Sequence, residues 1–446
     1  MRKSRFVALL LLLTCGLFQA GLSQQTLGLF ENDTAAYNGY TIFHPMGTTE
    51  TWMIDNCGRY VHSWPSATLP GLSVYLLENG QLLRPQLVPS VWFQGGGIGG
   101  RIELVDWQGN TVWQYLHANA FHHQHHDIEY LPNGNILILA WEMHSATEAF
   151  DRGREPNSLQ NDIWPEQIIE IEPYGTDSAN IVWEWHLWDH LIQDFDSTKL
   201  NYGVVADHPE LLDINASIQA ASGNPADWIH ANSIDYNEEL DQIMISSRNL
   251  HEILVVDHST TTAEAAGHTG GNSGKGGDLL YRWGNPQNYD RGDSSDQVLF
   301  GQHDAHWIEE KKPGEGMIMV LNNGTGRPGG SRSSVDVWAA PMDPAGNYVI
   351  AAGQPFGPTA LNWTYDPPVG QFYASFISGA SRLRNGNTLI TEGPGGRLFD
   401  IDSAGTIVWD YINPVNHNGP QTQGTTINGN NIFRAYKYRP EYSGFW

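Results

Sequence analysis

The chain has 446 residues, of which only 16 % are charged, whereas glycine, tryptophan and tyrosine are abundant (48, 17 and 18 residues). Glycine-rich turns between aromatic segments, without long amphipathic helical patterns, favour an all-β protein. The formal net charge of −26 argues against nucleic acid and anionic membrane surfaces as partners, because both require basic patches.

The N-terminus predicts export. Arg2, Lys3 and Arg5 precede an apolar run, Phe6–Leu13, and small residues follow near Ala20–Ser23. A short apolar segment with a basic start and small residues after it is typical of a secretory signal peptide. We therefore expect residues 1–23 to be removed in the periplasm or on secretion. Residues 24–446 are then expected to form one catalytic domain.

Cysteine is almost absent. Cys15 lies inside the predicted leader, and Thr14 before it fits a lipoprotein box poorly, so a lipid anchor at Cys15 is not expected. After cleavage only Cys57 remains, which excludes an intramolecular disulfide despite the oxidising setting. No other segment is long and apolar enough to span a membrane.

An aromatic segment recurs six times along the chain. Each copy has four residues and ends in tryptophan or tyrosine, as in Val61-His62-Ser63-Trp64. Alternating aromatic residues suit a strand that packs on two faces. The six copies end at Trp64, Tyr115, Trp185, Trp283, Tyr365 and Tyr411.

Two further landmarks accompany the aromatic segment. One is an apolar run that usually ends in an acidic residue. The other is an Asn-Gly pair, which readily adopts the positive φ angles of a tight hairpin turn. The Asn-Gly pairs are Asn79-Gly80, Asn133-Gly134, Asn385-Gly386 and Asn428-Gly429.

Each unit therefore offers about four short strands, and six such units around an axis predict a six-bladed β-propeller. A β-sandwich is the alternative, but it would not need six copies of the same landmarks. Asn38–His44 and Asn430–Tyr438 are expected to complete a shared blade that closes the ring. Loop insertions are expected to cap one face, at Ser145–Glu166, Asp189–Asp227 and Ser259–Asp278.

Histidines recur at the start of the first strand of a unit. They occur in His125-His126-Asp127, His230-Ala231-Asn232 and His303-Asp304. In a propeller this strand is the innermost, so these residues converge on the axis. Alignment on the turns places His126, Asn232, His303 and Ser378 in one register, with His230 one inward-facing step earlier. Each residue alone could be structural, but independent structural histidines have no reason to share a register.

Two chemistries fit a ring of histidines. Neutral imidazoles could bind a metal ion, although the spacing matches no tight metal motif. Alternatively, one imidazole could act as a nucleophile while neighbouring donors hold an oxyanion. Arg248 follows the next strand of the His230 unit. A guanidinium would be repelled by a metal ion and complements a sulfuryl or phosphoryl group, so it favours the second chemistry and predicts no metal and no cofactor.

Over about residues 38–440 the chain resembles the bacterial aryl-sulfate sulfotransferases, the exported type that does not use the adenosine phosphosulfate (PAPS) donor. Any one shared motif is weak, but their combination in this order is specific. The motifs are His125-His126-Asp127, Asp227-Trp228-Ile229-His230-Ala231-Asn232, Ser246-Ser247-Arg248, Tyr281-Arg282-Trp283-Gly284-Asn285-Pro286, Gln302-His303-Asp304 and the segment 382–389, Arg-Leu-Arg-Asn-Gly-Asn-Thr-Leu.

The resemblance implies a six-bladed propeller enzyme that transfers a sulfuryl group from a small aryl sulfate to a phenolic acceptor. By that resemblance His303 is the nucleophile that becomes a sulfohistidine, and His126, His230, Asn232 and Arg248 surround the sulfuryl oxygens. Two alternatives stay open. One is a sulfatase-like or metal-dependent hydrolase or lyase on the same scaffold, and the other is a propeller that binds without catalysis. The oligomeric state is not predicted.

Overall fold

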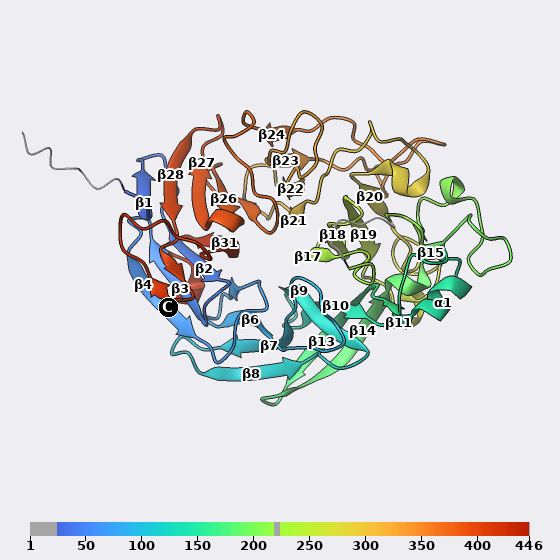
Figure 1. Ribbon diagram of the computed structural model, residues 1–446, viewed down its shortest axis with the longest axis horizontal. Helices are drawn as coiled ribbons and strands as arrows, with labels where there is room; N and C mark the ends of the chain where they lie inside the picture. Colours follow the sequence, from blue (N-terminus) through green and yellow to red (C-terminus); the bar gives the residue numbers. More distant parts are fainter. Residues whose placement is uncertain (1–24, 218–223, 446) are drawn as a thin grey trace, which may run out of the picture.

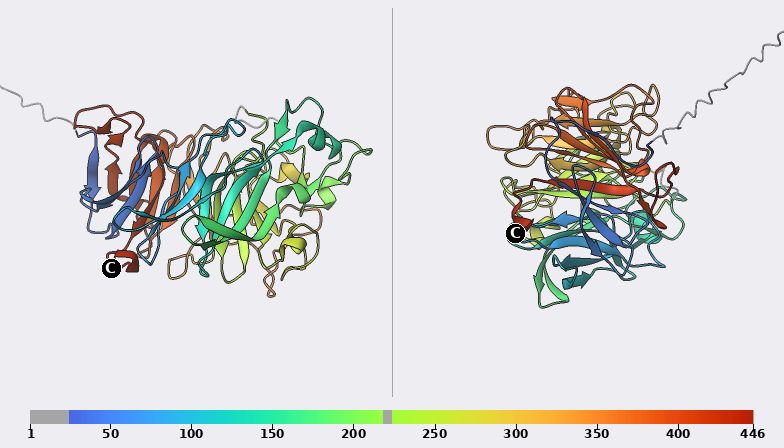
Figure 2. Two further views of the ribbon diagram at one scale, coloured as in Figure 1. Left: turned by 90° about the horizontal axis from the view of Figure 1, so that it is seen from below. Right: turned by 90° about the vertical axis from the view of Figure 1, so that its left-hand side faces the viewer.

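The computed structural model describes residues 25–217 and 224–445. Within these ranges five four-stranded antiparallel sheets and one five-stranded antiparallel sheet form a ring (Figure 1). Figure 2 shows the ring from its edge, with the strands running roughly along its axis. Each sheet is a blade and takes its name from its innermost strand. The six-bladed propeller predicted from the repeats is confirmed. The leader and Cys15 lie outside the described residues.

Five blades are built from consecutive strands, which follow one another from the axis outward. The β5 blade has β5 (Tyr75–Leu76), β6 (Leu82–Leu87), β7 (Gly100–Val105) and β8 (Thr111–Leu116). The β9 blade has β9 (His122–Tyr130), β10 (Ile136–Glu142), β13 (Glu166–Tyr174) and β14 (Ser178–His186). The β17 blade has β17 (Ala231–Asn237), β18 (Gln242–Ser247), β19 (Glu252–Asp257) and β20 (Tyr281–Trp283). The β21 blade has β21 (His303–Trp307), β22 (Ile318–Asn322), β23 (Ser334–Trp338) and β24 (Trp363–Tyr365). The β25 blade has β25 (Gly379–Arg382), β26 (Thr388–Glu392), β27 (Arg397–Ile401) and β28 (Ile407–Ile412), to which β1 (Gly28–Asn32) adds a fifth, outer strand.

The remaining blade joins the two ends of the chain. Its innermost strand is β31 (Ile432–Tyr438), followed outward by β2 (Tyr40–Pro45), β3 (Glu50–Asp55) and β4 (Tyr60–Pro65). Tyr438 pairs with Tyr40 and Ala435 pairs with Phe43. The closure expected between Asn38–His44 and Asn430–Tyr438 is thus confirmed, and it puts a C-terminal strand at the axis.

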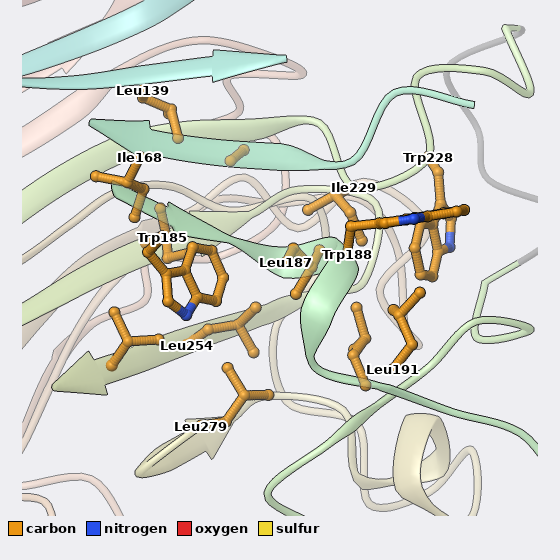
Figure 3. Packing of buried hydrophobic residues seen from close by; sticks show 14 of the residues in the cluster. Leu139, Ile168, Trp185, Leu187, Trp188, Leu191, Trp228, Ile229, Leu254 and Leu279 are labelled. Carbon is orange, nitrogen blue, oxygen red and sulfur yellow. The ribbon is translucent and has the colours of Figure 1, made fainter. Parts of the chain in front are cut away.

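The core consists of one apolar cluster between each pair of neighbouring blades. The aromatic repeat lies on the fourth strand of every blade, counted from the axis, and packs in these interfaces. Between the β9 and β17 blades, Trp185, Leu139 and Ile168 meet Leu254 (Figure 3). Because each blade buries one face against each neighbour, the ring rather than the single blade is the stable unit.

Three of the four Asn-Gly pairs form the expected turns between the first two strands of a blade, with positive φ at Gly80, Gly134 and Gly386. The fourth expectation was wrong. Asn428-Gly429 lies in the loop that leads into β31, because that strand pairs with β2 from the other end of the chain and not with the segment before it.

The insertions carry the minor elements. Residues 143–165 contain β11 (His144–Ser145), α1 (Ala146–Asp151) and β12 (Asp162–Ile163). Residues 187–230 contain η1 (Leu187–Asp189), β15 (Leu191–Ile192), η2 (Val205–Asp207) and β16 (Leu212–Asp213). The Ser259–Asp278 insertion contains α2 (Thr262–Ala265) and packs on the outer strand β14 of the neighbouring blade. The other short elements are η3 (Pro286–Tyr289), η4 (Gly393–Gly395), β29 (Val415–Asn416), β30 (Gly419–Pro420) and η5 (Ser443–Phe445).

Within the two described ranges, no helix has the length and apolar character needed to cross a bilayer.

Candidate active site

The innermost strands are irregular where the predicted residues lie. In β9 the residues His125 to Asp127 stand opposite the single residue Leu139 of β10. Similar bulges occur at Asn232 in β17, at Asp304 in β21 and at Arg434 in β31. A bulge bends a strand and re-aims its side chains. Four of the six inner strands, which surround the centre of Figure 1, thus carry a bulge at a polar residue.

The backbone at these bulges adopts uncommon conformations. The φ angles are +52° at His126, +49° at His230 and +61° at Asp304. Non-glycine residues rarely occupy this left-handed region, and such residues concentrate at functional sites. Two of the five predicted site residues, His126 and His230, thus have strained backbone conformations.

His303 has a fixed tautomer. Its Nδ1 lies 2.7 Å from Asn323 Oδ1 and 3.1 Å from the Gly301 carbonyl oxygen, and both oxygens only accept. Asn323 cannot be turned over, because its Nδ2 donates to the carbonyl oxygens of Ala374 and Ile377 at 2.8 and 2.9 Å. Nδ1 of His303 must carry the proton. Its Nε2 therefore holds the lone pair and has no hydrogen-bond partner among the described residues.

His303 is also held neutral. Burial lowers the pKa of its imidazole well below the usual value, and the charge of Arg248 lowers it further. His230 and Arg434 contribute in the same direction. A neutral imidazole with an unprotonated, unpartnered Nε2 is the form in which histidine is a nucleophile.

The rings of His126 and His230 make an edge-to-face contact beside the Gly95-Gly96-Gly97 segment. Their ring centroids lie 4.7 Å apart at an interplanar angle of 78°. A Cβ atom at Gly97 would overlap the His126 ring, and one at Gly96 would lie 3.4 Å from His230 Cε1. Only a segment without side chains can pass so close to both rings.

Two hydrogen-bonded partners hold these imidazoles from behind. His230 Nδ1 lies 2.6 Å from Asp227 Oδ2. His126 Nδ1 lies 2.9 Å from His125 Nδ1, and His125 Nε2 lies 2.8 Å from Glu166 Oε2. Glu166 thus stands at the end of a chain of buried groups that reaches His126.

Burial decides where the protons of this chain lie. Burial lowers the pKa of His125 to about 3 and raises the pKa of the Glu166 carboxyl, so the pair is neutral. The Glu166 carboxyl then donates to His125 Nε2, and His125 Nδ1–H donates to His126 Nδ1. Burial also lowers the pKa of His126 well below its usual value. His126 is therefore neutral with its proton on Nε2, where it is a hydrogen-bond donor.

Glu166 also forms a hydrogen bond to the first residue of strand β17. Its Oε1 accepts a 2.8 Å hydrogen bond from the backbone N–H of Ala231, which lies between His230 and Asn232. Asn232 is buried, and its Nδ2 donates to the Gln302 carbonyl oxygen at 2.8 Å, next to His303. One of its two N–H hydrogens remains free.

Arg248 is the half-buried cation of the group. Its Nη1 donates to Asn249 Oδ1 at 3.0 Å, and it forms no ion pair within residues 25–217 and 224–445. Burial lowers its pKa, and Asp227 opposes that effect. A guanidinium without a carboxylate partner remains available to an anion.

Arg434 forms the floor beneath these residues. Its Nη1 donates to Asp127 Oδ2 at 2.7 Å, its Nη2 donates to the Asn232 carbonyl oxygen at 2.6 Å, and its Nε lies 3.1 Å from Asp304 Oδ1. Burial alone would lower the pKa of Arg434. The negative charges of Asp127 and Asp304 have the larger effect and raise it. One side chain from the closing strand thus ties the β9, β17 and β21 blades together.

The structure brings all five predicted residues, His126, His230, Asn232, Arg248 and His303, to one group at the axis. Sequence reasoning missed Asn323, Glu166, Asp227 and Arg434. Asp227 was visible inside the Asp227–Asn232 motif, and the run of three glycines at 95–97 signalled a close approach. Asn323, Glu166 and Arg434 belong to no repeated landmark.

A family model described as Arylsulfotransferase (ASST) matches residues 31–423. No curated protein matches the chain. Among solved structures, a protein of unknown function from Bacteroides caccae is 11 % identical, with a TM-score of 0.48 over 90 % of this chain and 99 % of that chain. A virginiamycin B lyase from Staphylococcus aureus, solved with quinupristin, is 10 % identical, with a TM-score of 0.39 over 89 % of this chain and 92 % of that chain.

Proposed function

Because the chain belongs to the arylsulfotransferase family, we propose that it transfers a sulfuryl group from an aryl sulfate to a phenolic acceptor through a sulfohistidine on His303. The observation that carries this proposal is the tautomer of His303, with Nδ1–H bonded to Asn323 and the lone pair on Nε2. The proposal needs no cofactor.

In the first half-reaction, the Nε2 lone pair of His303 attacks the sulfur atom of the aryl sulfate. The N–S bond forms while the bond from sulfur to the aryl oxygen breaks, and the phenolate leaves with that electron pair. The ring becomes positively charged and keeps its Nδ1 proton. Asn323 Oδ1 accepts a hydrogen bond from that N–H and stabilises the charge.

In the second half-reaction, a phenol enters and its oxygen attacks the same sulfur atom. The N–S bond breaks, its electron pair returns to Nε2, and the sulfated product leaves. The phenol must lose its proton as it attacks. His230 is suited to accept it, because Asp227 holds its Nδ1–H and stabilises the imidazolium that forms.

The sulfuryl oxygens carry the negative charge in both steps, as in phosphoryl transfer. Arg248, the Nε2–H of His126 and the remaining N–H of Asn232 are the donors available to them in both steps, and His230 becomes a further donor once it has accepted the phenol proton. Removing one such donor typically lowers kcat by about 10²–10³. The net charge of −26 repels anions at long range, so this local group of donors must supply the attraction.

Aromatic side chains near the site supply a candidate surface for the aryl groups. Trp92 is 55 % exposed on the loop that leads into Gly95–Gly97, beside His126 and His230. Phe376 is 42 % exposed on the loop whose carbonyl groups orient Asn323. Exposed rings at the entrance of a polar site favour an aromatic ligand.

Export belongs to the same proposal. The basic and apolar pattern of residues 1–23 supports a signal peptide, followed by one catalytic domain at 24–446. The experiment that tests location is N-terminal sequencing of the protein recovered from the periplasm and the medium. A mature N-terminus near Gln24 supports export, whereas intact protein in the cytosol contradicts it.

Activity is tested with a chromogenic aryl sulfate and a phenol acceptor. The proposal expects sulfated acceptor to form in proportion to released phenol. Release of free sulfate at the same rate with and without acceptor would instead establish a hydrolase. No phenol release, with the fold intact, would leave only a binding function.

A further inference from the structure

A second group of histidines lies at the outer rim of the ring, where two insertions meet. His190 follows η1 at the end of strand β14 and is fully buried. His268 and Asp278 belong to the Ser259–Asp278 insertion. The Nδ1 atoms of His190 and His268 lie 2.8 and 2.7 Å from the same Asp278 oxygen. One ligand atom from each residue falls within a span of 4.8 Å.

The contacts of this group fix the tautomer of His190. His190 Nε2 lies 2.8 Å from the Ala265 carbonyl oxygen, which only accepts, so Nε2 carries a hydrogen. In a neutral imidazole Nδ1 then holds a lone pair, which faces the lone pairs of a carboxylate oxygen. The contact requires a proton on the Asp278 carboxyl, a second proton on His190, or a cation between the three residues.

We propose that His190, His268 and Asp278 bind Zn²⁺, with water as the fourth ligand. Two imidazole nitrogens and one carboxylate oxygen form a ligand set typical of zinc, whereas Ca²⁺ and Mg²⁺ prefer oxygen ligands alone. The hydrogen bond from His190 Nε2 to Ala265 is the second interaction that fixes a ligating histidine. Bond lengths of about 2.0–2.2 Å in a tetrahedral site require the three ligand atoms to move slightly apart. The His268 side chain is 60 % exposed and can make that movement.

A bound ion would cross-link the insertion of residues 187–230, which contains His190, to the Ser259–Asp278 insertion. Trp185 Nε1 donates to the Gly277 carbonyl oxygen at 2.7 Å, so the Ser259–Asp278 insertion packs on β14. A Cβ atom at Gly277 would overlap the Ala265 carbonyl oxygen and lie 2.6 Å from His190 Nε2, so glycine permits the approach. Within the described residues the single cysteine, Cys57, is free, so no disulfide joins the two insertions there. Because bound metal stabilises the folded state only, zinc should raise the Tm.

The test uses the full chain without a histidine tag, stripped with a chelator and then given ZnSO₄ alone. Metal analysis and calorimetry should give one Zn²⁺ per chain, with a higher Tm than the stripped protein. His268→Ala removes an exposed ligand and should fold normally, yet weaken zinc binding by at least about tenfold. Asp278→Asn should weaken it similarly.

His208→Ala is the matched control, because His208 is an exposed histidine of the neighbouring insertion, bonded to Glu210. It should keep full zinc binding. His122→Ala removes a histidine of the His122–His126 run, where adventitious zinc could bind, and should also leave the stoichiometry unchanged. Zinc binding that is equal in wild type and His268→Ala, or absent in wild type, would overturn the proposal. The readout is independent of sulfuryl transfer, so its failure would leave the proposed function untouched.

Discussion

Asn323 accepts a 2.7 Å hydrogen bond from His303 Nδ1, and two backbone carbonyl groups fix the orientation of its amide. This one contact decides which nitrogen of His303 carries the proton and leaves Nε2 without a partner among the described residues. The hydrogen bond joins the residue after strand β22 to the first residue of β21, so both partners lie in the same blade. The tautomer that the proposed mechanism requires is therefore set by the scaffold.

Replacing Asn323 with alanine should slow sulfohistidine formation. The Gly301 carbonyl oxygen alone, at 3.1 Å, would hold the Nδ1 proton weakly, and the ring could present N–H to the substrate. We expect the single-turnover rate to fall about 10- to 100-fold, with KM nearly unchanged. Rapid-quench kinetics measures this rate. A smaller burst at an unaltered rate would show that Asn323 only supports folding.

Glu166→Gln should keep most of the activity, whereas Glu166→Leu should lose it. A glutamine amide can donate to His125 Nε2 and accept from Ala231 N–H, as the neutral carboxyl does. Leucine does neither, and His126 then loses the proton order that makes its Nε2 a donor. We expect turnover within a few-fold of wild type for glutamine and about 10- to 100-fold lower for leucine. Equal losses in both variants, at similar Tm, would contradict a neutral Glu166.

The acid limb of sulfohistidine formation should lie well below pH 6.5. Burial and Arg248 lower the His303 pKa, so the neutral nucleophile persists on acidification and is lost only when the pH falls through that lowered value. The burst rate should therefore hardly change between about pH 8 and pH 6. Burst kinetics across this range checks it. A titration centred near 6.5 would mean that His303 is exposed to solvent in the working enzyme.

Trp92→Ala should weaken binding of the aryl group and leave the chemistry alone. Losing one aromatic stacking contact of about 0.5–1.5 kcal/mol corresponds to roughly a 2- to 12-fold rise in KM. Steady-state kinetics with aryl sulfates measures this rise. Tyr174→Ala is the matched control, because Tyr174 is similarly exposed but ends β13 at a hairpin outside the site. An unchanged KM in Trp92→Ala would remove Trp92 from the substrate surface.

The fold was predictable because the pattern of each blade is local in the sequence. Each unit repeats a strand, a tight turn and an aromatic fourth strand. The aromatic residues of that strand, such as Trp185 and Trp409, mark the blade in the sequence. The exception at Asn428-Gly429 arose where pairing is not local, since β31 closes the ring with β2.

The site was predictable only in part. His126, His230, Asn232, Arg248 and His303 stand in motifs that the family shares, so they could be read from the sequence. Glu166 acts through a contact 41 positions away, at His125, and Arg434 through one 307 positions away, at Asp127. Neither residue has a local sequence signal, because its partner is brought next to it only when the ring of blades closes. The bulges that turn these side chains inward also leave no mark in the apolar pattern.

The most direct test of the account is the intact mass of the protein after brief exposure to an aryl sulfate without acceptor. We expect one added sulfuryl group on wild type, its loss when a phenol is supplied, and no addition in His303→Ala. A sulfuryl adduct of the same stoichiometry in His303→Ala, or turnover without any adduct in wild type under rapid quench, would contradict a sulfohistidine on His303.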